Sequence, residues 1–133
     1  MRSTGPAPQP GAFLRWLPYL FGAGAIFWLV NLAQSAALAA APVGRAQLEQ
    51  TLTNAGLTVN VPAFLVVYFA VVFVFEITAA GLHGAAFYGL RSMRWWGWVV
   101  AVVVAGAWSL VLIGIPVLVY LLQRRTRQAY GVL

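Results

Sequence analysis

Three long apolar stretches dominate the pattern of hydrophobic and polar residues along the chain. They run over about 13–41, 62–90 and 95–123, and each is close to thirty residues long. A helix needs about 20 apolar residues to cross the roughly 30 Å hydrocarbon core of a bilayer. Helices of this length would extend for about 45 Å, so we expect their ends to project into the headgroup layers. The pattern predicts an all-α membrane protein with three transmembrane helices.

Two tails enclose this hydrophobic part of the chain. Residues 1–12 are rich in Pro, Gly and Ala and have nothing to bury, so they are predicted to be a disordered tail. Residues 124–133 form a basic C-terminal tail. We therefore expect one transmembrane domain over 13–123.

The loop over 42–61, between the first two stretches, is the only substantial polar segment inside this domain. Within it Leu48, Leu52 and Ala55 recur at the i, i+4, i+7 spacing of one helix face, and Gly56 is a suitable stop. These residues predict a short amphipathic helix on the membrane surface. An ordinary ordered linker fits them equally well.

The end of the first stretch also has features of a signal peptide. The segment SAALAAAP at 35–42 contains Ala37-Leu38-Ala39, an Ala-x-Ala pattern of the kind that precedes a cleavage site. The apolar residues before it exceed the usual signal core of about 7–15 residues. We therefore expect an uncleaved transmembrane helix, with a removed signal peptide as the alternative.

The composition agrees with a multi-pass membrane protein. Hydrophobic residues make up 62% of the chain and charged residues only 8%, against about 25% charged residues in soluble domains. The absence of cysteine excludes disulfides, thiol catalysis and cysteine-ligated metals. Arginine without lysine, together with abundant Ala, Val and Gly, suggests a GC-rich coding bias and favours a bacterial inner membrane as the location.

The net charge of +6 would also suit a nucleic-acid partner, but the positions of the arginines do not. No basic stripe with interleaved aromatics occurs on a polar helix, so nucleic acid is not expected. The arginines lie in tails, in loops or at the ends of apolar stretches, where lipid headgroups are expected. The partner that this pattern predicts is the lipid bilayer, contacted by Arg91, Arg94, Arg124, Arg125 and Arg127.

Membrane orientation is not decided by the arginines if there are three spans. Each side would then carry four: Arg2, Arg15, Arg91 and Arg94 on one, and Arg45, Arg124, Arg125 and Arg127 on the other. The positive-inside rule needs an asymmetry that this count lacks. Glu49 partly offsets Arg45, which favours an inside N-terminus.

Glu76 is the most informative single residue, because it lies fourteen residues from either end of its predicted span. An acidic residue at the bilayer centre costs about 2.5–3.5 kcal/mol on insertion scales and usually faces protein or a cavity. We expect it to be protonated and hydrogen-bonded, with Ser109 at the same depth or Asn31 nearby as its partner. A structural hydrogen bond, a partner contact and proton transport all remain open as its role.

Further polar residues are candidates for binding a proton or ligand. His83 follows Glu76 by two helical turns, about 10 Å along the axis and too far for a direct ion pair. It has neither a second His nor a Cys to complete a metal or haem site. We expect it to be buried and bonded to a residue such as Tyr19. Asn31 and Gln34, with Ser35, form the polar patch of the first span.

Small residues recur every four positions on two predicted spans, and such faces let helix backbones approach closely. They serve either packing within the chain or an interface with another chain. The two faces consist of Gly97, Ala101, Ala105 and Ser109 in the third span, and of Gly81, Ala85 and Gly89 in the second.

No phosphate loop, catalytic triad or pair of catalytic carboxylates is present, so we expect neither an enzyme nor a cofactor or metal. A short chain with an intramembrane Glu is similar to the small multidrug-resistance transporters. Those proteins have four spans with the Glu in the first, and FVFEITAAG around Glu76 does not match them, so no family is assigned. We expect a self-associating protein or an accessory subunit of a larger membrane complex. The alternative is a small proton-linked transporter or channel that uses Glu76.

Overall fold

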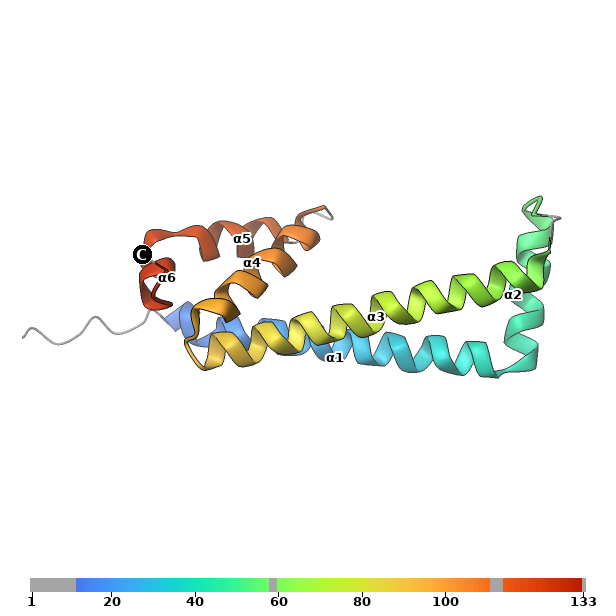
Figure 1. The fold of residues 1–133 in the computed structure, drawn as a ribbon, viewed down its shortest axis with the longest axis horizontal. Coiled ribbons are helices and arrows are strands. Elements are labelled where there is room, and N and C mark those ends of the chain that lie inside the picture. The colour runs from blue at the N-terminus through green and yellow to red at the C-terminus, as the bar shows by residue number, and fades with distance from the viewer. Residues whose placement is uncertain (1–11, 58–59, 111–113, 133) are drawn as a thin grey trace, which may run out of the picture. The chain divides into compact units, whose positions relative to one another are not determined.

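The computed structural model describes residues 12–57, 60–110 and 114–132, and these residues are all-helical, with no strand (Figure 1). By length and composition, two helices are long enough and apolar enough to cross a membrane, and a third apolar helix is shorter. The helices are α1 (Ala12–Ala40), α2 (Pro42–Asn54), α3 (Val61–Arg91), α4 (Trp95–Ser109), α5 (Gly114–Leu122) and α6 (Arg124–Ala129).

The chain divides into two compact units, and α1 and α3 contribute to both. Unit 1 consists of Met1–Gly22 and Leu82–Leu133, and unit 2 consists of Ala23–Gly81. Unit 2 therefore contains the second part of α1, all of α2 and the first part of α3. Unit 1 contains the beginning of α1, the end of α3 and the three C-terminal helices.

In unit 2, α1 and α3 meet along one stripe of each helix. On α3 the buried residues are Leu65, Phe69 and Glu76, whose spacing of four and seven places them on one helix face. Trp28 of α1 lies edge-on against Phe75 of α3, with 5.3 Å between the ring centroids. The remaining apolar surface of the two helices is mostly exposed.

Helix α2 occupies the loop between them, so a helix forms where the sequence predicts one, and its place on a membrane surface stays a prediction. It begins with Pro42 in its first turn, after the extended Ala41, because the fixed φ of proline suits the start of a helix. It ends at Asn54, and Gly56 follows with φ +93°, a conformation that favours glycine. None of its side chains is fully buried.

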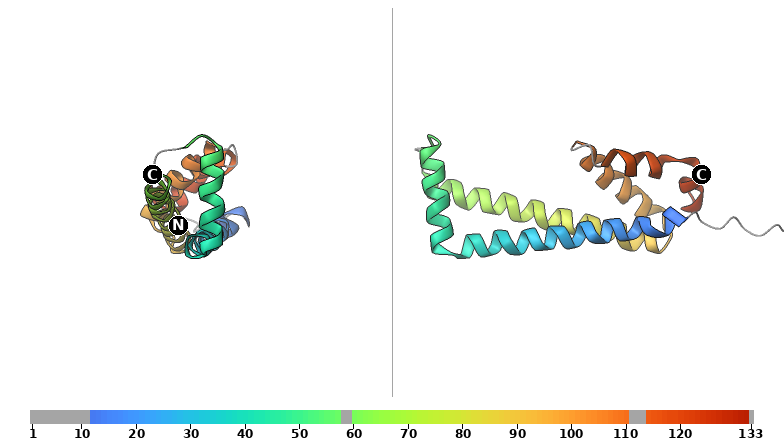
Figure 2. Two further views of the ribbon diagram at one scale, coloured as in Figure 1. Left: turned by 90° about the vertical axis from the view of Figure 1, so that its right-hand side faces the viewer. Right: turned by 180° about the vertical axis from the view of Figure 1, so that it is seen from behind.

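The third apolar stretch differs from its prediction. Instead of one helix over 95–123, it forms α4 and α5, which fold back against each other (Figures 1 and 2). Pro116 cannot donate a backbone hydrogen bond, and in a continuous helix its ring would clash with a carbonyl four residues earlier. Gly114 lies so close to α4 that a Cβ there would collide with the Ala105 oxygen and the Ser109 nitrogen.

The two helices of this hairpin are antiparallel, and hydrogen bonds fix the end of α5. The indole Nε1 of Trp98, near the start of α4, donates to the Leu121 oxygen near the end of α5 at 2.8 Å. The Thr126 hydroxyl of α6 donates to the Tyr120 oxygen at 3.0 Å. The end of α5 therefore lies beside the start of α4.

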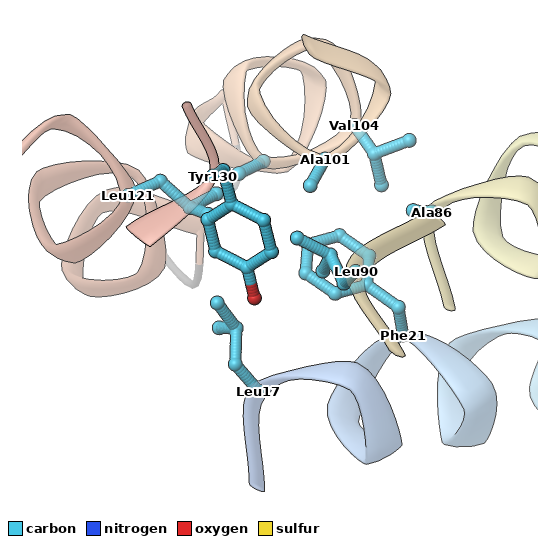
Figure 3. Packing of buried hydrophobic residues seen from close by; sticks show 9 residues of the cluster. Leu17, Phe21, Ala86, Leu90, Ala101, Val104, Leu121 and Tyr130 are labelled. Carbon is cyan, nitrogen blue, oxygen red and sulfur yellow. The ribbon is translucent and has the colours of Figure 1, made fainter. Parts of the chain in front are cut away.

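The buried core of unit 1 lies where five segments meet: the start of α1, the end of α3, both arms of the hairpin and the residue after α6. Figure 3 shows Tyr130 directed towards Leu17 across this cluster. Dense packing of this kind is sensitive to single methylene groups. Its members are Leu17, Phe21, Ala86, Leu90, Ala101, Val104, Ala105, Leu121 and Tyr130.

Candidate functional site

Glu76 lies on the stripe of α3 that faces α1 in unit 2, and only 6% of it is exposed. The hydroxyl of Ser35 on α1 donates a hydrogen bond of 2.9 Å to Oε1 of Glu76. The second carboxyl oxygen, Oε2, is buried and has no hydrogen-bond partner among the described residues. A buried polar atom without a partner is unusual in a folded protein. The pair is therefore the candidate site of unit 2.

The sequence predicts Ser109 or Asn31 as the partner of Glu76, but in the structure the Ser109 hydroxyl and the Asn31 amide donate to other acceptors. Ser109 donates to the Ala105 oxygen on its own helix at 2.8 Å, and Asn31 donates to the Phe27 oxygen at 2.8 Å. Gln34 is exposed. The partner within unit 2 is Ser35, which belongs to the polar patch predicted for the first span.

The direction of helical side chains explains this choice of partner. A side chain in an α-helix leans towards the N-terminus of its helix. Because α1 and α3 are antiparallel, Glu76 leans towards the α2 end, and Ser35 leans from that end towards Glu76. The two side chains therefore meet, although Ser35 lies fewer residues from the α2 end of its helix than Glu76 does. Among the polar residues of α1, residue depth alone, without this lean, favours Asn31 over Ser35.

His83 forms a separate polar contact in unit 1. It is 6% exposed, and its Nε2 accepts a hydrogen bond of 2.9 Å from the Trp108 indole nitrogen. The ring of Phe21 lies 6.2 Å from the imidazole, centroid to centroid. This hydrogen bond links α3 to α4. The prediction of a buried, hydrogen-bonded histidine named Tyr19, but Tyr19 instead lies edge-on to Phe87 at 6.1 Å.

The small-residue face of α4 is largely occupied within unit 1. Gly97, Ala101 and Ala105 are buried and Ser109 is half-buried. Gly89 of α3 and Gly97 approach so closely that a Cβ on either would collide with the backbone of the other helix. The face of α3 is divided: Gly89 is in this contact and Ala85 is half-buried.

Gly81, the remaining member of that face, belongs to unit 2 and is open. Apart from its chain neighbours and the nearby backbone of its own helix, no described atom lies within 4 Å of the position that a Cβ on Gly81 would take. A neighbouring backbone can therefore approach α3 closely at this point.

The arginines predicted to contact headgroups are gathered in unit 1. Arg91, Arg94, Arg124 and Arg125 are exposed, and Arg127 is half-buried. The guanidinium of Arg127 lies 6.0 Å from the centre of the Trp98 ring, a distance typical of a cation–π contact.

Within residues 12–57, 60–110 and 114–132, no group of three or more His, Cys, Asp or Glu side chains is placed to hold a metal ion. No family model, curated protein or solved structure matches the chain.

Proposed function

We propose that the chain is a non-enzymatic integral membrane protein that assembles with further copies of itself or with other membrane subunits, with α1 and α3 as its spans. The observation that carries this proposal is the exposed apolar surface of unit 2. Outside the stripe that each helix presents to the other, many large aliphatic side chains of α1 and α3 in unit 2 are 42% to 71% exposed. Soluble monomers rarely expose apolar patches on this scale. Lipid or another membrane protein is the environment that suits them.

Two exposed features of unit 2 support a protein neighbour in addition to lipid. Gly81 leaves the α3 backbone open to close approach. Gln34 presents an exposed amide on the apolar α1. Small residues that admit a second backbone, and polar side chains that bond across helices, are the features that drive helix association in membranes.

Cross-linking in native membranes tests this proposal, because the chain has no cysteine of its own. The variant Gly81→Cys should form a disulfide-linked dimer or a cross-link to a defined membrane subunit. Val71→Cys, which is 63% exposed on the same helix, is the matched control and should cross-link several-fold less. Equal, weak cross-linking at both positions would mean that Gly81 faces lipid.

A second candidate function, proton-linked transport, is supported by Glu76. A buried carboxyl group with one oxygen that lacks a hydrogen-bond partner in the described chain has the chemistry to take up and release a proton. Glu76→Gln should then fold and assemble like the parent but carry no proton-coupled flux in proteoliposomes. If the Gln variant behaves like the parent in cells and in vesicles, the carboxyl group is structural and the assembly role stands alone.

A further inference from the structure

The part of the chain from α4 to Tyr130 begins and ends at the same end of unit 1. Trp98 of α4 is bonded to the Leu121 oxygen of α5, and Arg127 lies over the same indole ring. Tyr130 then packs into the cluster that holds Leu17 of α1 and Leu90 of α3 (Figure 3). The C-terminal tail, the start of α1 and the end of α3 therefore lie at one end of unit 1.

The connection at the other end of the hairpin is apolar. The ten residues over 110–119, LVLIGIPVLV, contain no polar side chain, and Leu110 is 90% exposed. Polar residues return only after α5, from Gln123 onwards. A loop that emerges into water between two spans is usually polar, whereas this sequence suits hydrocarbon.

The two arms are also too short for two ordinary spans. Helix α4 has 15 residues and α5 has 9, which correspond to about 22 Å and 14 Å at 1.5 Å per residue. The hydrocarbon core is about 30 Å thick, and a re-entrant segment is one of the structures that apolar helices too short to cross it form.

A broken helix is tolerated in a bilayer only where protein covers its backbone or satisfies it. Here the Trp98 indole and the Thr126 hydroxyl donate hydrogen bonds to carbonyl oxygens at the end of α5. At the other end, Gly114 lies directly on the α4 backbone. These contacts satisfy or cover the backbone at both ends of α5.

We infer that α4 and α5 form a re-entrant hairpin, which enters and leaves the membrane on the side of the α3–α4 turn and places the C-terminal tail on that side. This inference rests on the proposed membrane location. Unit 1 contains neither acidic residue of the chain, and six of the seven described arginines belong to it: Arg15, Arg91, Arg94, Arg124, Arg125 and Arg127.

With two spans and this hairpin, the arginines decide the orientation of the protein in the membrane. With three spans they are equally divided and do not decide it. If α1 and α3 are the two spans, the chain segments with these six arginines belong to one side of the membrane, and the α2 segment with Arg45 and Glu49 belongs to the other. The positive-inside rule then places the arginine-rich side in the cytoplasm. Each arginine near an anionic leaflet contributes about 1 kcal/mol, so the partner of this surface is a layer of anionic lipid headgroups.

Single-cysteine labelling with a membrane-impermeant maleimide tests the hairpin. The labelled sites are exposed polar positions: Gln50 in α2, Ser92 in the α3–α4 turn and Gln128 in α6. In right-side-out vesicles Gln50→Cys should react, while Ser92→Cys and Gln128→Cys should react only after inversion or permeabilisation. Leu110→Cys should resist the reagent from both sides, because it lies in hydrocarbon.

Labelling of Gln128→Cys together with Gln50→Cys would overturn the hairpin, because it would show a third complete span. Reaction of Leu110→Cys from the Gln50 side would do the same. Release of the parent protein from membranes by alkaline carbonate would instead contradict the proposed membrane location. The two failures are therefore distinguishable.

Discussion

Ser35 donates a hydrogen bond of 2.9 Å to the Oε1 atom of Glu76, and this bond joins α1 to α3 across a stripe of otherwise apolar contacts. Both residues belong to unit 2, so the bond acts within one compact part of the chain. It gives one oxygen of the Glu76 carboxyl group a hydrogen-bond partner. A carboxyl group without a partner would be costly in hydrocarbon.

The first prediction concerns this bond. Glu76→Gln keeps an oxygen that can accept the Ser35 proton, so its unfolding free energy in detergent should stay within about 1 kcal/mol of the parent. Glu76→Ala removes packing as well and should lower it by more. A double-mutant cycle with Ser35→Ala should give a coupling energy of roughly 0.6 kcal/mol, up to about 1.7 kcal/mol, as for other bonds between membrane helices. Additive effects would mean that the two side chains do not interact.

Much of the fold could be predicted from the sequence because it depends on local patterns. The apolar stretches of α1 and α3 and the Pro42 and Gly56 boundaries of α2 are visible in residue order alone. The division of the third stretch was not predicted, because it depends on the contact of Gly114 with the α4 backbone, which only the folded chain reveals. Gly114 and Pro116 are the signal in the sequence that allows such a break.

The candidate site was predictable in part. The position of Glu76 in an apolar stretch identified the residue, but its partner depends on the lean of side chains across antiparallel helices. His83 was expected to be buried and hydrogen-bonded, yet its donor, Trp108, comes from a helix whose packing against α3 is a tertiary property. Sequence alone gives no register between such helices.

The second prediction compares two glycines of α3. Gly89→Ala should destabilise unit 1 by about 1–3 kcal/mol, because the new methyl group collides with the Gly97 backbone. Gly84→Ala is the matched control: a Cβ there meets nothing within 4 Å, and alanine favours a helix by up to about 1 kcal/mol over glycine. Thermal unfolding in detergent measures both. Equal effects would contradict the close approach of α3 and α4.

The third prediction concerns the bond between Trp108 and His83. Trp108→Phe keeps an aromatic ring but removes the indole donor, so it should lower stability by about 1–3 kcal/mol. Trp16→Phe is the control, since Trp16 is 70% exposed, and it should be nearly silent. Chemical unfolding of the two variants side by side checks this, and a loss for Trp16→Phe as large as that for Trp108→Phe would count against it.

The fourth prediction is a pH dependence from Tyr130, which is 2% exposed and whose hydroxyl has no hydrogen-bond partner in the described chain. Burial first, and then the nearby Tyr120, raise the pKa of Tyr130 to about 12 from 10.0. Because the folded pKa is the higher one, the stability contribution is complete below pH about 10 and is lost as the pH rises through 12. The loss is of the order of 2–3 kcal/mol.

Tyr130→Phe separates this titration from the other alkaline effects. Phenylalanine keeps the packing against Leu17 and leaves no buried hydroxyl, so the variant should be as stable as the parent at neutral pH. Its unfolding midpoint should change less than that of the parent between pH 10 and 12. Identical pH profiles would show that Tyr130 does not cause the loss.

The most direct test of the account is the native mass of the protein after transfer from its own membrane into lipid nanodiscs. We predict a defined assembly, either a multiple of the chain mass or one chain mass plus that of a stoichiometric membrane subunit. Gly81→Leu should shift this assembly towards single chains, because the larger side chain closes the open face of α3. A single chain as the only species, unchanged by Gly81→Leu, would contradict the proposal that this protein works by assembling in the membrane.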